Sequence, residues 1–204
     1  MKNLLQPLSR ITSLLFHPLL VPTWGFLLLA GSGFYFAILP WRVKSVLLLI
    51  VFLFTCLLPA LSIWLLSLSP RFDLKMEKST DRILPLLMSA LFYYSGYLVL
   101  ERMPLFPIFN LFLIASILVQ IALIILSLRW KISAHSAAMG GLIGGFMAIS
   151  FRLHQYSLPM LALLILAAGM VGSARLILLK HSSWEVYTGF TLGFLIMNLL
   201  ITFI

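Results

Sequence analysis

The sequence is poor in charged residues and contains a single cysteine. Charged side chains make up 9% of its 204 residues and apolar ones 62%, whereas a typical soluble domain has roughly 25% charged residues. No polar segment is long enough to enclose a core, which excludes a separate soluble domain. Alternating ten-residue strands, the pattern of outer-membrane barrels, are also missing. Cys56 alone excludes an internal disulfide. A helical membrane protein remains.

What the sequence does contain is a series of seven long apolar runs, each near or above the ~18 residues that can span a bilayer. We predict an all-α, polytopic transmembrane bundle of six to seven spans that forms one integral membrane domain over residues 1–204. Residues 1–70 would supply two N-terminal spans, and residues 71–204 the rest. The N-terminus lacks a cleavage site of small residues, so we expect no removable signal peptide. The runs are 11–41, 45–70, 83–100, 103–128, 132–151, 153–174 and 186–204.

The net charge of +9 is scattered over short loops. A nucleic-acid site would gather these charges on one helix or tail, so we expect membrane lipids as partners and no nucleic acid. Because each span carries the chain across, successive loops alternate sides. The N-terminus and the loops near 71–82, 129–135 and 175–185 share one side, which we call side A. It holds ten of the fourteen Lys and Arg and four of the five acidic residues, so polar chemistry is concentrated there.

The side A loops carry side chains suited to binding a phosphate ester. Fixed cations and the N–H groups at helix N-termini both bind phosphate oxygens. Arg175 interrupts an apolar stretch, where an arginine costs at least ~2.5 kcal/mol near the bilayer centre and less near the interface, so it either has an anionic partner or extends to the interface. Four positions separate His181 from Glu185, so on a helix they could hydrogen-bond. The candidate residues are Lys75, Arg82, Ser133, His135, Arg175, His181 and Glu185.

In order and spacing these residues resemble the motifs of the membrane branch of the type 2 phosphatidic acid phosphatase (PAP2) and vanadium haloperoxidase superfamily. Those motifs are Lys-x6-Arg-Pro, Pro-Ser-Gly-His and Ser-Arg-x5-His-x3-Asp. The matches are Lys75 and Arg82 for the first, Ser133 and His135 for the second, and Arg175 and His181 for the third. The departures are Ile83 and Ile132 for proline, Ala134 for glycine, Ala174 for serine and Glu185 for aspartate.

The resemblance implies a PAP2-like core over residues 71–204 and a lipid phosphatase that needs no metal or other cofactor. His181 would be the nucleophile that forms a phosphohistidine, oriented by Glu185. His135 would be the general acid and later the general base. The substrate would be phosphatidic acid, phosphatidylglycerol phosphate, a polyprenyl diphosphate or a lipid A phosphate. The phosphate would be bound by Lys75, Arg82, Ser133, Ala134 and Arg175.

Several local interpretations stay open beside this assignment. Ser182-x-x-Glu185 also reads as a capping box, and we treat capping and orienting as competing roles of Glu185, favouring the second. We expect neither His17 nor His154 to reach the side A pocket. Small residues four apart predict close packing of the fifth and sixth runs. The cluster Ser79-Thr80-Asp81 is expected to cap the helix beginning near Arg82.

Two other functions fit the same residues. The imperfect second and third motifs allow a non-catalytic lipid-phosphate binding or transport protein, and a phosphotransferase would use the same phosphohistidine with a different acceptor. The resemblance implies the bacterial inner membrane. The bias of Lys and Arg places side A in the cytoplasm, whereas many bacterial members of the superfamily work on the outer face, so the side of the site stays open.

Overall fold

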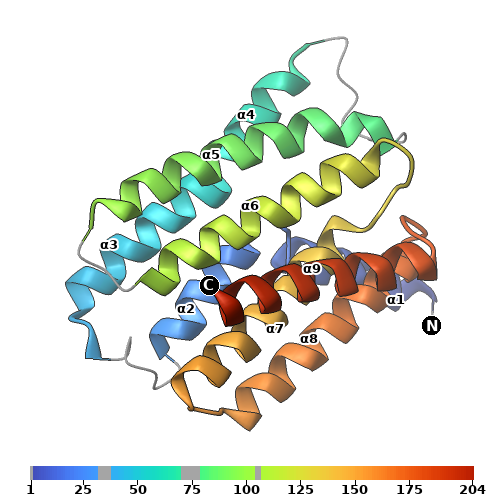
Figure 1. Cartoon of the computed structure of the whole chain (residues 1–204). Coiled ribbons are helices and arrows are strands. Elements are labelled where there is room, and N and C mark those ends of the chain that lie inside the picture. The colour runs from blue at the N-terminus through green and yellow to red at the C-terminus, as the bar shows by residue number, and fades with distance from the viewer. Residues whose placement is uncertain (1, 32–37, 70–78, 104–106) are drawn as a thin grey trace.

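The computed structural model describes residues 2–31, 38–69, 79–103 and 107–204, and all regular elements among them are helical. Six helical stretches are long and apolar enough to cross a membrane, which confirms the predicted helical membrane bundle. Most of them run roughly alongside one another (Figure 1). They are α3 (Trp41–Phe52) continued by a π-helix (Leu53–Leu57) and α4 (Leu58–Ser67), α5 (Ile83–Glu101) after a 3-10 turn (Ser79–Arg82), α6 (Pro107–Ser127), α7 (Ala134–Leu153), α8 (Leu158–Ile177) and α9 (Ser183–Phe203).

The first apolar run does not form the predicted single span. It contains two shorter helices, α1 (Lys2–Leu15) and α2 (Val21–Gly31), with a turn over residues 16–20 between them. Pro18 lies in this turn, and because proline lacks the backbone N–H and crowds the preceding turn, it disfavours continuation of α1. Helix α2 has 11 residues, about 16 Å, against a hydrocarbon core of about 30 Å. Among the described residues, six helical stretches are therefore long enough to span, which is the lower end of the predicted six to seven.

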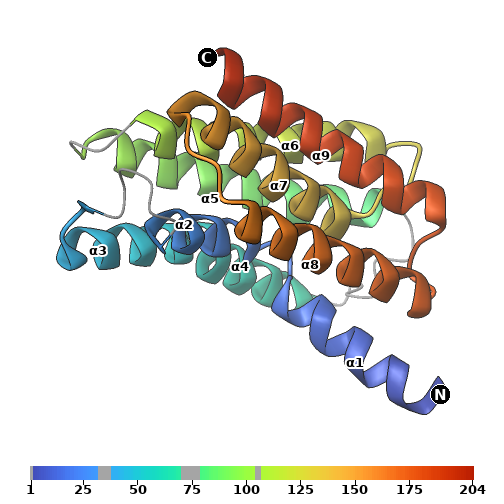
Figure 2. The same ribbon diagram turned by 90° about the horizontal axis from the view of Figure 1, so that it is seen from below.

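Helix α1 turns its polar side toward the protein. Ser9 and Ser13 are buried, whereas Leu8, Ile11 and Leu14 are each more than 60% exposed. The helix packs against α8, and Figure 2 shows it leaving the bundle beside α8 with the N-terminus at its far end. A helix with its apolar face outward is stable where that face meets lipid and not water. Helix α1 therefore brings buried hydroxyls to the bundle.

Helix α7 is the most enclosed span. Within its most apolar segment 72% is buried inside the protein, compared with 22–39% for the other spans. Its glycines lie against α9. A Cβ on Gly140 would overlap the backbone carbonyl of Phe190, and a Cβ on Gly193 of α9 would overlap that of Ala137. On α8, a Cβ on Gly169 would meet nothing within 4 Å. The fifth and sixth runs do pack against each other as α7 and α8, but the glycines of α7 bring it closest to α9, which the sequence did not predict.

This contact supports a stability prediction. Gly140→Ala should destabilise the protein by about 1–3 kcal/mol, since the new methyl group must displace the backbone of α9. Gly169→Ala adds the same methyl group to a helix in open space and is the matched control. Thermal unfolding in detergent, followed by circular dichroism, compares the two. A Gly140→Ala midpoint at or above that of Gly169→Ala would show that α7 and α9 do not approach this closely.

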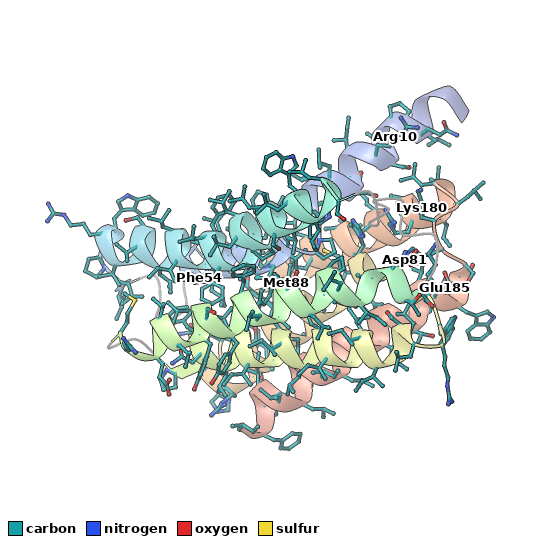
Figure 3. All side chains as sticks on the ribbon, turned by 90° about the horizontal axis from the view of Figure 1, so that it is seen from above. Arg10, Phe54, Asp81, Met88, Lys180 and Glu185 are labelled. Carbon is teal, nitrogen blue, oxygen red and sulfur yellow. The ribbon has the colours of Figure 1, made fainter. Side chains whose placement is uncertain are left out.

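The order of the helices brings the side A loops to one end of the bundle. Figure 3 labels Arg10 of α1, Asp81 before α5, Lys180 after α8 and Glu185 of α9, and all four lie at the same end. The hydrogen bonds described below join the segments of this end directly. We call it the side A end.

Candidate active site

His181 lies in the turn between α8 and α9 and is buried. Its Nδ1 is 2.9 Å from Glu185 Oε2 and 3.1 Å from the carbonyl oxygen of Lys131. A carbonyl oxygen and a carboxylate can only accept hydrogen bonds, so Nδ1 carries the proton. The neutral ring then has its lone pair on Nε2. Lys131 and Glu185 therefore fix the tautomer that a nucleophilic histidine needs.

Glu185 performs both of the roles that the sequence presented as competitors. Its Oε2 accepts from His181 Nδ1 and also, at 3.1 Å, from the backbone N–H of Ser182. The Ser182 hydroxyl accepts from the backbone N–H of Glu185 at 3.4 Å, which completes a capping box at the start of α9. The interpretation that one role would exclude the other is wrong, because one carboxylate oxygen has two lone pairs. The helix cap itself holds the orienting carboxylate in place.

Arg82 and Arg175 act on His181 through their charges. The pKa of His181 is lowered to about 4, chiefly by burial and then by the positive charges of Arg82 and Arg175, while its hydrogen bond to the Glu185 carboxylate opposes this shift. Arg82 also donates from Nη1 to the carbonyl oxygen of Ile132 at 3.1 Å, so the start of α5 is tied to the segment before α7. His181 is therefore neutral near pH 7 and lies close to two guanidinium groups.

This shift gives a pH prediction. The pKa of His181 should be about 6.5 in the unfolded chain and about 4 in the folded protein. Between these pH values the unfolded state therefore binds more protons than the folded state. The stability due to the neutral ring is complete above about pH 6.5 and decreases as the pH falls toward about 4. Histidine ring NMR in detergent, assigned with His181→Gln, should show no protonation of His181 between about pH 8 and about 5. A midpoint near about 6.5 would contradict the described burial.

The start of α7 is fixed against α9. Ser133 is the N-cap of α7, fully buried, and its hydroxyl accepts from the backbone N–H of Ser136 at 3.3 Å. Its own backbone N–H donates to the carbonyl oxygen of Glu185 at 3.1 Å. Ala134 and His135 occupy the first turn, where backbone N–H groups have no acceptor within the helix. The second and third motif regions thus meet, with the positive end of α7 at the site.

Two further site residues, Ser13 and His17, come from the N-terminal segment, and the expectation that His17 cannot reach the pocket is wrong. The Ser13 carbonyl oxygen is 3.1 Å from His135 Nε2, and Arg175 Nη1 donates to the Ser13 hydroxyl at 3.5 Å. The His17 ring lies edge-to-face on that of His135, with centroids 5.4 Å apart. His154, by contrast, is the C-cap at the other end of α7.

A sequence pattern could have revealed this segment. Ser9, Ser13 and His17 recur every four residues, so on a helix they share one side. Pro18 follows directly, and a proline predicts a break at the residue before it. Hydropathy averaged over the whole run hides both features. The pattern indicates a broken helix that presents polar groups to the bundle.

The remaining predicted residues divide into those that the structure places and one that it does not. Lys75 lies outside the described residues. Arg82 occupies the N-cap position of α5 and makes no side-chain cap. Ser79, Thr80 and Asp81 lie in the 3-10 turn that leads into α5, so the expectation that they cap this helix is wrong. In residues 2–31, 38–69, 79–103 and 107–204, no three His, Cys, Asp or Glu side chains are grouped so that they could hold a metal ion.

A cavity of about 80 Å³ opens inward from the side A end, between α2, α5, α6 and α7. Most of its walls are apolar. Pro18 and Ala134, the neighbours of His17 and His135 in the chain, both line it. So do Tyr93 of α5 and Gln120 of α6, which are buried deeper in the bundle. The polar cluster and an apolar cavity are therefore adjacent.

Taken together, the described residues form a helical membrane protein with a histidine, a carboxylate and two guanidinium groups at one end of the bundle. Comparisons with family models, curated proteins and solved structures give no match.

Proposed function

We propose that the protein is a metal-independent lipid phosphatase that hydrolyses a lipid phosphomonoester or diphosphate through a phosphohistidine on His181. The three spacing motifs that resemble the PAP2 superfamily motivate this proposal. The resemblance also leads us to propose the bacterial inner membrane as its location. Phosphatidic acid, phosphatidylglycerol phosphate, polyprenyl diphosphates and lipid A phosphates are the substrate classes to be tested.

The observation that carries the proposal is that the half-buried Arg82 and Arg175 have no close carboxylate in the part of the chain that the structure describes. Among the described residues, no carboxylate lies within 4 Å of the guanidinium of Arg82 or Arg175. The buried Nε of Arg175 has no hydrogen-bond partner there either. A buried charge without a partner is costly, so the cluster favours an anionic ligand. One guanidinium group can bind two phosphate oxygens at once. The phosphate of a membrane lipid lies at the level of the membrane interface.

The chemistry follows from the tautomer of His181. Its Nε2 lone pair attacks phosphorus, the bond from phosphorus to the lipid oxygen breaks, and the proton on Nδ1 stays with Glu185 and Lys131 as acceptors. The Glu185 carboxylate stabilises the positive charge that develops on the imidazole. Arg82 and Arg175 stabilise the negative charge on the phosphoryl oxygens. Water then attacks the phosphohistidine, inorganic phosphate leaves and His181 regains its lone pair.

Phosphate release by the purified protein tests this function. The wild type in detergent with excess EDTA is supplied with each of the four lipid classes, beside a mock purification from cells that lack the gene. We expect release from at least one class at an unchanged rate with EDTA. Binding of those lipids without release would instead favour the non-catalytic binding protein. Loss of release with EDTA, restored by a divalent metal, would refute the metal-independent mechanism.

A further inference from the structure

The N-terminal segment contributes side chains and backbone groups to the side A end that the three motifs do not contain. The Ser13 carbonyl oxygen, which can only accept, fixes the proton of a neutral His135 on Nε2 and leaves Nδ1 with the lone pair. In His17 the other ring nitrogen is engaged, because Nδ1 accepts from the backbone N–H of Leu19 at 3.4 Å. A neutral His17 therefore carries its proton on Nε2. The two rings present one donor and one acceptor nitrogen that these contacts leave available.

His17 lies at the boundary between the polar cluster and the apolar cavity. Pro18, the next residue, is a wall of the apolar cavity, and the charge of Arg175 on the other side contributes, after burial, to lowering the pKa of His17. Ala134 places His135 at the same boundary. At about 80 Å³ the cavity has about half the volume of one that holds benzene, so it can take only the beginning of a lipid chain.

A bound lipid phosphate would cross this boundary at the oxygen that joins its phosphoryl group to its chain. Its phosphoryl group would lie with Arg82, Arg175 and His181, and the start of its chain would lie in the cavity. The oxygen that joins the two would then lie beside the His17 and His135 rings. That oxygen is the leaving group, and it needs a proton when the ester of an alcohol is cleaved.

We propose that His17 is a further catalytic residue, which acts with His135 on the oxygen of the lipid leaving group. This inference rests on the proposed phosphatase function. When the phosphate dianion binds, its negative charge favours protonation of the pair of imidazoles, which takes up one proton from water. When the bond between His181 Nε2 and phosphorus forms and the bond from phosphorus to the lipid oxygen breaks, that proton moves to the oxygen. The alcohol leaves, and the pair takes one proton from the water that cleaves the phosphohistidine.

Leaving groups of different basicity separate this role from a structural one. p-Nitrophenyl phosphate releases a stabilised phenolate that needs little protonation, whereas dioctanoyl phosphatidic acid releases an alkoxide. His17→Phe keeps an aromatic ring against His135 but removes both ring nitrogens. We expect it to lower kcat/KM for dioctanoyl phosphatidic acid by at least ~100-fold and for p-nitrophenyl phosphate by less than ~5-fold. His154→Asn, at the far end of α7 with a left-handed backbone that asparagine tolerates, is the control and should change neither.

Each other outcome has a definite meaning. Equal losses on both compounds, or no loss on either, would overturn the role of His17 and leave the phosphatase in place. A wild type active on the aryl ester alone would also contradict it, since no alkoxide would then be expelled. Release from neither compound would overturn this inference, and the proposed function stands or falls with the panel of four lipid classes. Gel filtration and the thermal midpoint of His17→Phe establish that the variant is folded.

Discussion

Replacing His181 by alanine is expected to reduce phosphate release by at least ~10⁴-fold, because the residue that forms the covalent bond is lost and only binding by the cationic cluster remains. The loss should appear in kcat for every substrate that the wild type hydrolyses, whatever its leaving group. Affinity for inorganic phosphate should change little, since Arg82 and Arg175 are untouched. Initial rates with the best lipid of the panel, together with phosphate competition, measure both quantities.

A second variant separates chemistry from folding. His181→Ala leaves the carbonyl oxygen of Lys131 and the carboxylate of Glu185 without their shared donor. His181→Gln retains an N–H group that can serve these acceptors but has no ring nitrogen that attacks phosphorus. Both variants should be equally inactive, and His181→Gln should be the more stable. Activity within ~10-fold of the wild type in either one would refute His181 as nucleophile.

Replacing Glu185 by glutamine should reduce kcat by at least ~100-fold with a folded protein. The amide keeps an oxygen that can cap the Ser182 N–H, but it carries no charge to stabilise the imidazole as the bond to phosphorus forms. Steady-state kinetics on Glu185→Gln gives this loss directly.

Ser182→Ala is the matched partner of Glu185→Gln. It removes the hydroxyl that accepts from the backbone N–H of Glu185, but leaves the contact between Glu185 and His181 in place. We expect a loss of about 1 kcal/mol in stability and a change in kcat of less than ~5-fold. Equal losses of kcat in Ser182→Ala and Glu185→Gln would show that Glu185 acts only as a helix cap.

The sequence was sufficient to predict the meeting of the motif regions. Apolar runs have the length of spans, and two runs separate each successive pair of motifs, so the residues around Arg82, Ser133 and His181 had to reach one end. In the structure, hydrogen bonds from Arg82 to Ile132 and from Ser133 to Glu185 join them. The contact of His181 with Glu185 was predicted from helical spacing and is present, although His181 lies in the turn before α9 and not on the helix.

Other features depended on tertiary contacts that hydropathy does not encode. The break at Pro18 was hidden inside a long apolar run, so His17 was assigned away from the site. The glycines of α7 predicted a close approach but not the partner, since small residues on two helices fit the same pattern. Gly193 of α9 identifies that partner only once its contact with Ala137 is known. The double role of Glu185 needed atomic positions, because spacing alone does not show which groups share one oxygen.

Mapping of the phosphoryl group on the enzyme tests the account most directly. The wild type is mixed with one equivalent of its best lipid substrate. The reaction is quenched within the first turnover in alkali, in which phosphohistidine is stable, and the protein is digested for mass spectrometry. We predict phosphate on the peptide that contains His181, its loss on acid treatment, and its absence from His181→Gln. Rapid first-turnover release with no phosphate on His181 at any quench time, or with phosphate on another residue, would contradict the mechanism.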